Sequence, residues 1–216
     1  MYNNKNKEIM KKTIMLLIVC LSLSVVGNAQ TKKPVRRTSK NVAQISKEPS
    51  ANGKFKFYTD GFFHETDKKD YVIITAPGKS VSNIKSSVLS SLSSMYTNPS
   101  KVISTIGDNI VNVNAYASDV LVKDEFISYK HYSFAYNIKI EIKAGKIKVE
   151  APSFSNIIEK NVPIMPGNRT TEKYIDTQTL YEELTKAGEK YQVKAEEIIN
   201  SHIDKIVSGL SSNSDW

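Results

Sequence analysis

Apolar and polar residues alternate most regularly within residues 133–153. Every second residue from Phe134 to Ile142 is apolar, as expected of a strand with one buried face. Ala144-Gly145 fits the two-residue turn of a hairpin, and such a turn fixes the register of the two strands that it joins. The sequence therefore predicts an antiparallel hairpin with one apolar face and one charged face.

The predicted register places isoleucines opposite apolar residues and lysines opposite glutamates. The apolar pairs are Ile142 with Ile147, Ile140 with Val149, and Ile138 with Ala151; the charged pairs are Glu141 with Lys148 and Lys139 with Glu150. A slip by one residue would expose the isoleucines and lose the charge match. The apolar face needs a helical layer over it.

A strand, a turn and a helix are predicted between Asp70 and Tyr96. Residues 71–75 are β-branched or aromatic, and Pro77-Gly78 ends the strand. Ser80 and Ser82 are candidates for the N-cap of the helix that follows. Apolar residues recur along this helix at Val81, Ile84, Val88, Leu92 and Met95.

Other segments give weaker signals. Shorter strands are predicted at residues 54–59, 101–106 and 109–117. Residues 119–130 show no clear period and stay unassigned. Residues 154–176 contain turn-forming residues such as Pro166-Gly167, and we expect mainly loops there.

A second helical pattern occupies residues 177–210. Its inward positions are Leu180, Leu184, Ala187, Tyr191, Ala195, Ile198, His202, Ile206 and Leu210. Gly188 interrupts this pattern at a cost of about 1 kcal/mol relative to Ala, so we expect one helix with a weak point or two helices that meet there. At His202 a hydrogen-bonded core histidine is expected rather than a metal ligand.

The distal part of this helix carries a wide apolar stripe. Ile199, Ile203 and Val207 widen the stripe beyond what contact with one sheet face requires. These residues form a self-association or partner surface if they are exposed, because exposed apolar patches mark interaction sites. The alternative is that they are buried within one chain.

The first 29 residues have the pattern of a secretory signal peptide. Lysines from Lys5 to Lys12 precede an apolar region at residues 14–26, and Ala29 is the last of three small or polar residues before Gln30. Cleavage is therefore expected between Ala29 and Gln30. A lipidated Cys20 is the alternative, against which the position of the cleavage site argues.

Positive charge is concentrated ahead of the predicted domain. The chain has a net charge of +8, but residues 51–216 hold 20 basic and 20 acidic residues. Residues 30–50 hold six basic residues and one acidic residue, which predicts a basic disordered tail. This tail could make weak contact with an anionic membrane surface, or it is a solvated spacer.

One α+β domain is predicted over residues 51–210. Its core covers residues 68–156 and its helical region residues 177–210, with a disordered end at residues 211–216. The elements predict an antiparallel sheet of about five strands with two helices on one face, the second helix being long and C-terminal.

Few residues suggest chemistry. Removal of the signal peptide removes Cys20, the only cysteine. His64, Glu65, Asp67 and Asp70 are residue types that bind metals, but nothing in their spacing fixes a geometry.

The segment Gly78-Lys79-Ser80 resembles the end of a phosphate-binding loop. However, Ile73 stands where the first glycine of that motif is required. We therefore predict no catalytic, cofactor-binding or metal-binding residue, and no cofactor.

Several short runs together resemble one protein family. They are Asp70 to Ser80, Tyr96-Thr97-Asn98-Pro99, Val102-Ile103-Ser104 and the Lys143 to Ile147 hairpin turn. The family comprises secreted proteins of Bacteroides-type bacteria, a domain of unknown function with a fold like one repeat of TATA-binding protein. The resemblance covers residues 68–156. It implies a curved antiparallel sheet backed by two helices, and export to the periplasm or cell surface of a Gram-negative bacterium, but no site residues.

The expected function is that of an exported, non-catalytic binding or structural module of the cell envelope. Its partner would be an unknown envelope protein or a second copy of the chain. An enzyme acting on an envelope polymer is an alternative, although no nucleophile–base pair is evident. Nucleic-acid binding through the sheet face is another, but a neutral domain offers little attraction for phosphate, and no nucleic acid is expected as a partner.

The first prediction concerns processing of the N-terminus. Mass spectrometry of the exported protein should find a chain that begins at Gln30, because the positive, apolar and small-residue regions precede that position. A diacylglyceryl group on Cys20 would contradict this.

Overall fold

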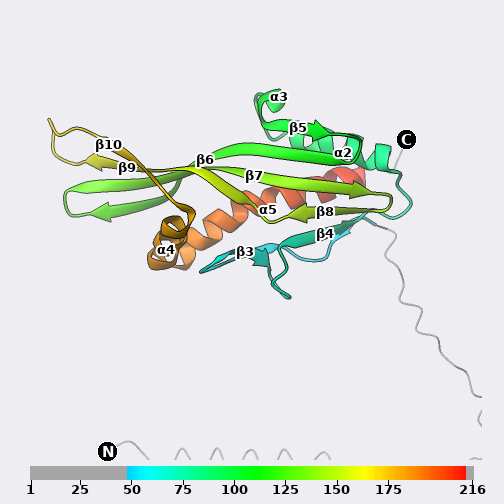
Figure 1. Cartoon of the computed structure of the whole chain (residues 1–216), viewed down its shortest axis with the longest axis horizontal. Coiled ribbons are helices and arrows are strands. Elements are labelled where there is room, and N and C mark those ends of the chain that lie inside the picture. The colour runs from blue at the N-terminus through cyan, green and yellow to red at the C-terminus, as the bar shows by residue number, and fades with distance from the viewer. Residues whose placement is uncertain (1–47, 213–216) are drawn as a thin grey trace, which may run out of the picture. The chain divides into compact units, whose positions relative to one another are not determined.

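The computed structural model describes residues 48–212. The predicted signal peptide and its cleavage site, Cys20, most of the basic tail and the last four residues lie outside the described residues. The described part is α+β, with a mostly antiparallel sheet and four helices (Figure 1). Its main sheet has eight strands, so the expectation of about five strands is wrong.

Strands and helices are interspersed along the chain. They are β1 (Ser50–Ala51), β2 (Phe55–Tyr58), β3 (Gly61–His64), β4 (Tyr71–Thr75), α2 (Val81–Ser93), α3 (Pro99–Val102), β5 (Ile103–Ile106), β6 (Ile110–Glu125), β7 (Ser128–Lys143), β8 (Lys146–Glu150), β9 (Ser153–Pro163), β10 (Thr171–Ile175), α4 (Thr177–Ala187) and α5 (Glu189–Ser212). β1 pairs with β4, so the predicted tail ends one residue too late, inside a strand.

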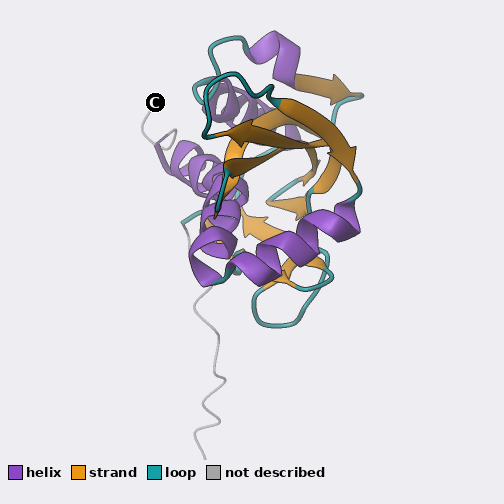
Figure 2. Cartoon of the chain, turned by 90° about the vertical axis from the view of Figure 1, so that its left-hand side faces the viewer, coloured by secondary structure: helices purple, strands orange, loops and turns teal. Residues whose placement is uncertain are grey.

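The long strand β7 organises the sheet. β6 pairs with it from Ser128 to Glu141. On its other edge, the first half of β7 pairs with β9 and the last four residues pair with β8. β4 and β1 follow β8, β5 follows β6, and β10 follows β9. Figure 2 shows the twist and curvature of the strands and the helices beside them.

The β7–β8 hairpin has the predicted register. Ile142 pairs with Ile147, and Ile140 pairs with Val149. The expected partner of Ile138 is not paired with it, because β7 changes its neighbour from β8 to β9 at this point.

The charges on the outer face of this hairpin form a connected set of ion pairs. The Lys139 ammonium lies 3.3 Å from the Glu150 carboxylate, as predicted, and 2.6 Å from that of Glu141. Lys148 contacts Glu150 at 3.0 Å. Lys148 is therefore opposite Glu141 across the strands but has a different ion-pair partner.

The helix α2 covers the apolar face of the sheet. It begins after Ser80, whose hydroxyl accepts a hydrogen bond from the Asn83 amide at 3.2 Å. Ile84, Val88 and Leu92 are fully buried, as the spacing predicts. Ser87 and Ser91, on the adjacent face of α2, are buried as well, because α5 packs against this face.

The contact between α2 and α5 requires a glycine. A Cβ atom on Gly209 would lie 1.7 Å from the Ser91 hydroxyl oxygen, so no larger residue fits without displacing α2. Ser91 turns its hydroxyl back to the Ser87 carbonyl of its own helix at 2.7 Å, which satisfies it without a partner on α5.

The C-terminal pattern forms two helices, one of the two outcomes expected. α4 ends at Ala187, and Gly188 has a φ of 88°, a conformation that glycine adopts without strain. α5 then continues to Ser212.

The distal helix does not present the predicted partner surface. Ile199 and Ile203 are each only 1% exposed and belong to the core, while Val207 is half-buried and packs against it. The prediction of an exposed surface is therefore wrong for both isoleucines. The apolar stripe is wider than contact with one sheet face requires because α5 contacts the sheet, α2 and β2 at once.

β2 and β3 form a separate hairpin that is attached to α5 through side chains. The Asn200 amide accepts from the Phe55 N–H at 2.9 Å and donates to the Phe55 carbonyl at 2.8 Å. Glu196 accepts from the Phe57 N–H at 2.9 Å. α5 thus supplies hydrogen bonds that a neighbouring strand would otherwise provide.

The strand predicted at residues 101–106 begins two residues later than expected, because Lys101 and Val102 belong to α3. Two longer segments differ more from the sequence prediction. Residues 119–130, unassigned above, continue β6 past a bulge between Ala117 and Leu121 and then turn into β7. Residues 154–176, expected to be loops, form β9 and β10. Both belong to an extension of the sheet made by the β6–β7 and β9–β10 hairpins.

The register predicts that neighbouring residues of β7 tolerate substitution very differently. Ile140→Lys should destabilise the protein by several kcal/mol, because Ile140 is fully buried and no partner is present for a charge there. Lys139→Ala should have a far smaller effect, since Lys139 lies on the open face. Denaturant unfolding measures both, and equal midpoints would show that the faces are assigned wrongly.

Candidate functional site

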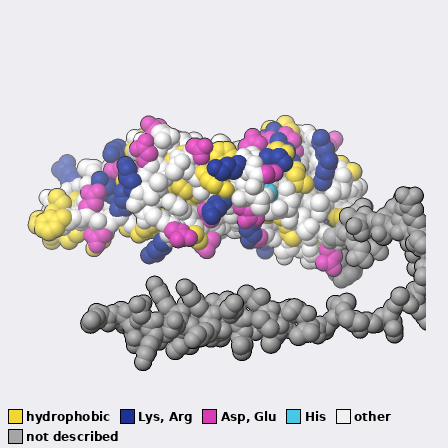
Figure 3. All heavy atoms as spheres, turned by 90° about the horizontal axis from the view of Figure 1, so that it is seen from below, with side chains coloured by type: hydrophobic (Ala, Val, Ile, Leu, Met, Phe, Trp, Pro, Cys, Tyr) yellow, Lys and Arg dark blue, Asp and Glu magenta, His cyan; other side chains and the backbone are white. Residues whose placement is uncertain are grey.

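The extension ends in four large apolar side chains. Phe126 and Ile127 form the turn between β6 and β7, and Ile164 and Met165 follow the end of β9. Phe126 is 100% exposed, Ile127 58%, Ile164 49% and Met165 62%. We refer to these four residues as the apolar tip. In Figure 3, hydrophobic side chains gather at the left-hand end of the described residues, where Figure 1 shows the two hairpins ending.

The two halves of the apolar tip lie side by side. The Ile164 N–H donates to the Ile127 carbonyl at 3.0 Å, and Ser128 is paired with Pro163. One hydrogen bond therefore joins the hairpin turns beyond the last rung of the sheet. The apolar tip is one surface rather than two separate loops.

No charged side chain interrupts the tip segments. Residues 126–129 and 161–168 are uncharged, and Tyr129, which is 41% exposed, lies two residues behind Ile127. Behind these segments, Glu125 is paired with Lys130 at 2.6 Å. Charges thus surround the apolar tip without entering it.

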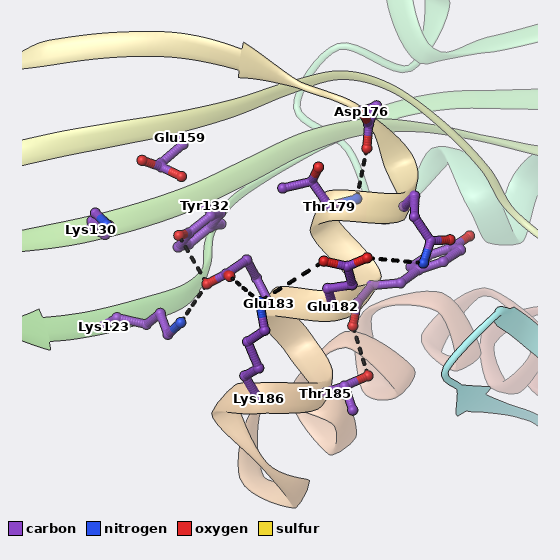
Figure 4. A network of polar contacts seen from close by, with 12 residues as sticks. Lys123, Lys130, Tyr132, Glu159, Asp176, Thr179, Glu182, Glu183, Thr185 and Lys186 are labelled. Carbon is purple, nitrogen blue, oxygen red and sulfur yellow. Dashed lines mark hydrogen bonds and ion pairs between the residues drawn. The ribbon is translucent and has the colours of Figure 1, made fainter.

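The base of the extension is fastened to α4 by the polar cluster in Figure 4. Glu183 of α4 accepts from Lys123 of β6, from the Tyr132 hydroxyl at 3.2 Å and from Lys186 at 3.3 Å. Asp176 begins α4 by accepting from the Thr179 amide at 2.7 Å. Side chains from two strands and one helix therefore meet at one carboxylate.

The electrostatics of this cluster favour a charged glutamate and a neutral tyrosine. Burial alone would raise the pKa of Glu183, but the hydrogen bonds from Lys123 and Lys186 outweigh it, and the net pKa is lowered. Burial raises the pKa of Tyr132, and the carboxylates of Glu159 and Glu183 raise it further. Glu159 is itself buried and lies 3.1 Å from the Lys173 ammonium. The cluster is a structural clamp, because each of its carboxylates is bound by a cation, a hydroxyl or a backbone amide.

A second polar group surrounds His202, which is buried on α5. Its Nδ1 lies 3.2 Å from the Ile198 carbonyl and 3.1 Å from that of Ile199, so Nδ1 carries the proton. Nε2 then accepts from the Tyr96 hydroxyl at 2.5 Å. Burial lowers the pKa of His202, against the raising effect of those carbonyls. His202 is thus the hydrogen-bonded core histidine that the sequence predicts.

An open hollow of about 560 Å³ lies beside Tyr96. Its lining includes Tyr136, Asn114, Asn137 and Asn156. Burial raises the pKa of Tyr136, and so does its proximity to Tyr96, so both phenols are neutral near pH 7. The Tyr96 hydroxyl is engaged by His202, and the lining contains no acidic or basic side chain.

The residues of metal-binding type between His64 and Asp70, and the segment Gly78-Lys79-Ser80, make contacts within the protein. His64 and Asp67 do meet, with Nδ1 2.7 Å from the carboxylate, but Glu65 accepts from the Lys54 N–H at 3.1 Å. Within residues 48–212, no group of three His, Cys, Asp or Glu side chains could hold a metal ion. In Gly78-Lys79-Ser80, the serine is the N-cap of α2.

Sequence reasoning missed the apolar tip. Phe126-Ile127 lies in the segment without a clear period, and Ile164-Met165 lies next to Pro166-Gly167 in the segment assigned to loops. The available signal was a pair of large apolar residues beside turn-forming residues, which is unusual in a solvated loop.

Comparisons with known proteins do not add to this description. No protein-family model matches the chain, and neither the curated proteins nor the solved structures give a match. Between residues 48 and 212 there is no helix with the length and hydrophobicity needed to cross a membrane.

The Glu183 cluster should make stability depend on pH. The pKa of Glu183 is below its ordinary value of 4.5 in the folded state. Its stabilisation is therefore complete above about pH 4.5 and is lost as the pH falls through the folded-state pKa. At pH 7, Glu183→Gln should lower the free energy of unfolding by about 1 kcal/mol or more, because a charged acceptor is lost.

Glu182→Gln is the matched control, since Glu182 is the exposed neighbour on the same helix. Urea unfolding between pH 7 and pH 3 should show the difference between wild type and Glu183→Gln shrinking as the pH falls. A difference that stays constant over this range would contradict the assigned role of Glu183.

Proposed function

We propose that this chain is an exported, non-catalytic module of the cell envelope that attaches to an envelope component through its apolar tip. The observation that carries the proposal is the group of four exposed side chains Phe126, Ile127, Ile164 and Met165. Burial of a fully exposed Phe is worth about 1.5–3 kcal/mol, so this surface holds binding energy that the isolated chain does not use. Export is supported by the signal-peptide pattern of residues 1–29.

The position of the apolar tip supports an attachment role. Ion pairs and hydrogen bonds clamp the base of the extension to α4, and the tip lies beyond this clamp. A rigid base holds the turn residues in one place relative to the body, which lowers the cost of ordering them on binding.

The ion pairs on the open face of the sheet argue against nucleic-acid binding through that face. Lys139 and Lys148 each lie within 3.3 Å of a glutamate oxygen. Lysines that are already paired with glutamates neutralise few phosphates. Neutralisation of phosphates, which releases the counterions condensed on the nucleic acid, supplies much of the affinity for phosphate backbones.

Membership of the secreted Bacteroides-type family, with a fold like one repeat of TATA-binding protein, stays part of the proposal. The antiparallel sheet with α2 and a long α5 on one face is compatible with it. The extension formed by β6, β7, β9 and β10 would then be an addition to the family's curved sheet.

Cell fractionation tests the proposed function. Wild-type protein should sediment with the envelope and resist washing in buffer. Phe126→Ser/Met165→Ser should reduce the envelope-bound fraction at least about tenfold, because two large apolar contacts are lost. The unfolding midpoint should stay close to that of wild type, since both residues are exposed.

The matched control is Tyr174→Ser, because Tyr174 is 76% exposed on β10 but is not part of the apolar tip. It should leave the envelope-bound fraction unchanged. Retention of the double variant at the wild-type level would show that the apolar tip is not the attachment site.

A further inference from the structure

The chemistry of the apolar tip narrows what it binds. We infer that the apolar tip inserts into the acyl-chain boundary of a phospholipid bilayer while the rest of the sheet stays in water. This inference rests on the proposed function and names the component to which the module attaches.

The first argument is the state of the backbone at the apolar tip. Unpaired N–H groups are costly in an apolar medium, because no water is present to accept from them. Pro163 and Pro166 have no N–H, and the N–H of Ile164 is already bonded to the Ile127 carbonyl. Within residues 163–166, three of the four positions therefore present no free N–H donor.

The second argument is the shape and packing of the tip. The tip lies at the ends of two adjacent hairpins (Figure 1), and Phe126 is fully exposed. Binding in a protein pocket requires shape complementarity in addition to a well-placed anchor. A fluid acyl layer accepts an exposed Phe without shape complementarity, which favours lipid as the occupant.

The third argument is the order of side chains along the hairpins. Tyr129 lies directly behind the apolar residues, where the amphipathic ring of a tyrosine suits the membrane–water interface. The segments 123–130 and 160–170 together hold four basic residues and two acidic ones. Three of the basic residues are ion-paired: Lys123 with Glu183, Lys130 with Glu125 and Lys160 with Glu172. The fourth, Arg169, is exposed near the tip segments, and an arginine stem can extend along an apolar surface and keep its charge in the headgroup region.

The length of the apolar tip fits insertion into one leaflet only. Phe126 and Ile127 lie side by side in the two-residue turn past the last paired rung, so the backbone extends by only about one residue, about 3.3 Å, and the side chains reach further. Interfacial elements bury their apolar face by about 5–10 Å, whereas the hydrocarbon core is about 30 Å thick. The expected binding is therefore reversible and superficial.

A tryptophan placed at the apolar tip tests insertion directly. Phe126→Trp would be made in the full chain with Trp216→Phe, which removes the only natural tryptophan. The probe is a phosphatidylcholine vesicle, with and without phosphatidylglycerol, whose acyl chains carry bromine. The emission of Trp at position 126 should shift to shorter wavelength and be quenched by the bromine.

Tyr116→Trp in the same background is the positional control. Tyr116 is 57% exposed on β6, about ten residues or roughly 30 Å from the tip. Its emission should not be quenched. Adding Ile127→Ser to Phe126→Trp should lower the vesicle partition coefficient about tenfold.

Other results overturn either the inference or the proposed function. Absence of quenching at position 126 on every vesicle would exclude insertion into lipid. If Phe126→Ser/Met165→Ser nevertheless releases the protein from the envelope, the proposed function stands and the tip binds a protein. Equal quenching at positions 126 and 116, seen only with phosphatidylglycerol and abolished by salt, would mean contact through the basic tail. If insertion occurs but the double variant stays on the envelope, the proposed role in attachment fails instead.

Discussion

The structure depends on backbone pairing along both edges of β7. This strand has β6 on one side, and β9 followed by β8 on the other. At about 3.3 Å per residue its 16 residues span about 53 Å, whereas the 24 residues of α5 span about 36 Å. The sheet is therefore longer than the helix that covers it, and the excess length becomes the extension that carries the apolar tip.

α2 and α5 are held over the rest of the sheet by contacts of several kinds. α2 and α5 approach closely at Gly209, where no side chain intervenes. His202 and Tyr96 share a buried hydrogen bond, and Asn200 binds the backbone of β2. Gly209, His202 and Asn200 thus position α5 relative to three other parts of the chain through close packing and specific hydrogen bonds.

The division between a stabilised base and an exposed tip follows from the same geometry. As far as the rung of Lys123, α4 lies against the strands and supplies Glu183 as a common acceptor. The strands continue past this rung, and their apolar turn residues are at least 49% exposed. Contiguous exposed apolar residues mark interaction sites, and the proposed attachment rests on this.

Local pattern alone determined the elements whose residues repeat with a clear period. The β7–β8 hairpin, α2 with its Ser80 cap and the break at Gly188 follow from side-chain alternation, capping and the conformational freedom of glycine. These features depend on residues close in the chain, and the sequence contains all of them.

Tertiary structure alone decided the features that join distant residues. β9 and β10 were missed because the pairing of β9 with β7, and of β10 with β9, compensates for a weak local pattern. Ile199 and Ile203 are buried because three elements converge on α5. The apolar tip exists only because Ile127 and Ile164, 37 positions apart, meet through one backbone hydrogen bond. Whether an apolar side chain is core or surface depends on what folds over it, and this is a property of the whole chain rather than of its neighbours in sequence.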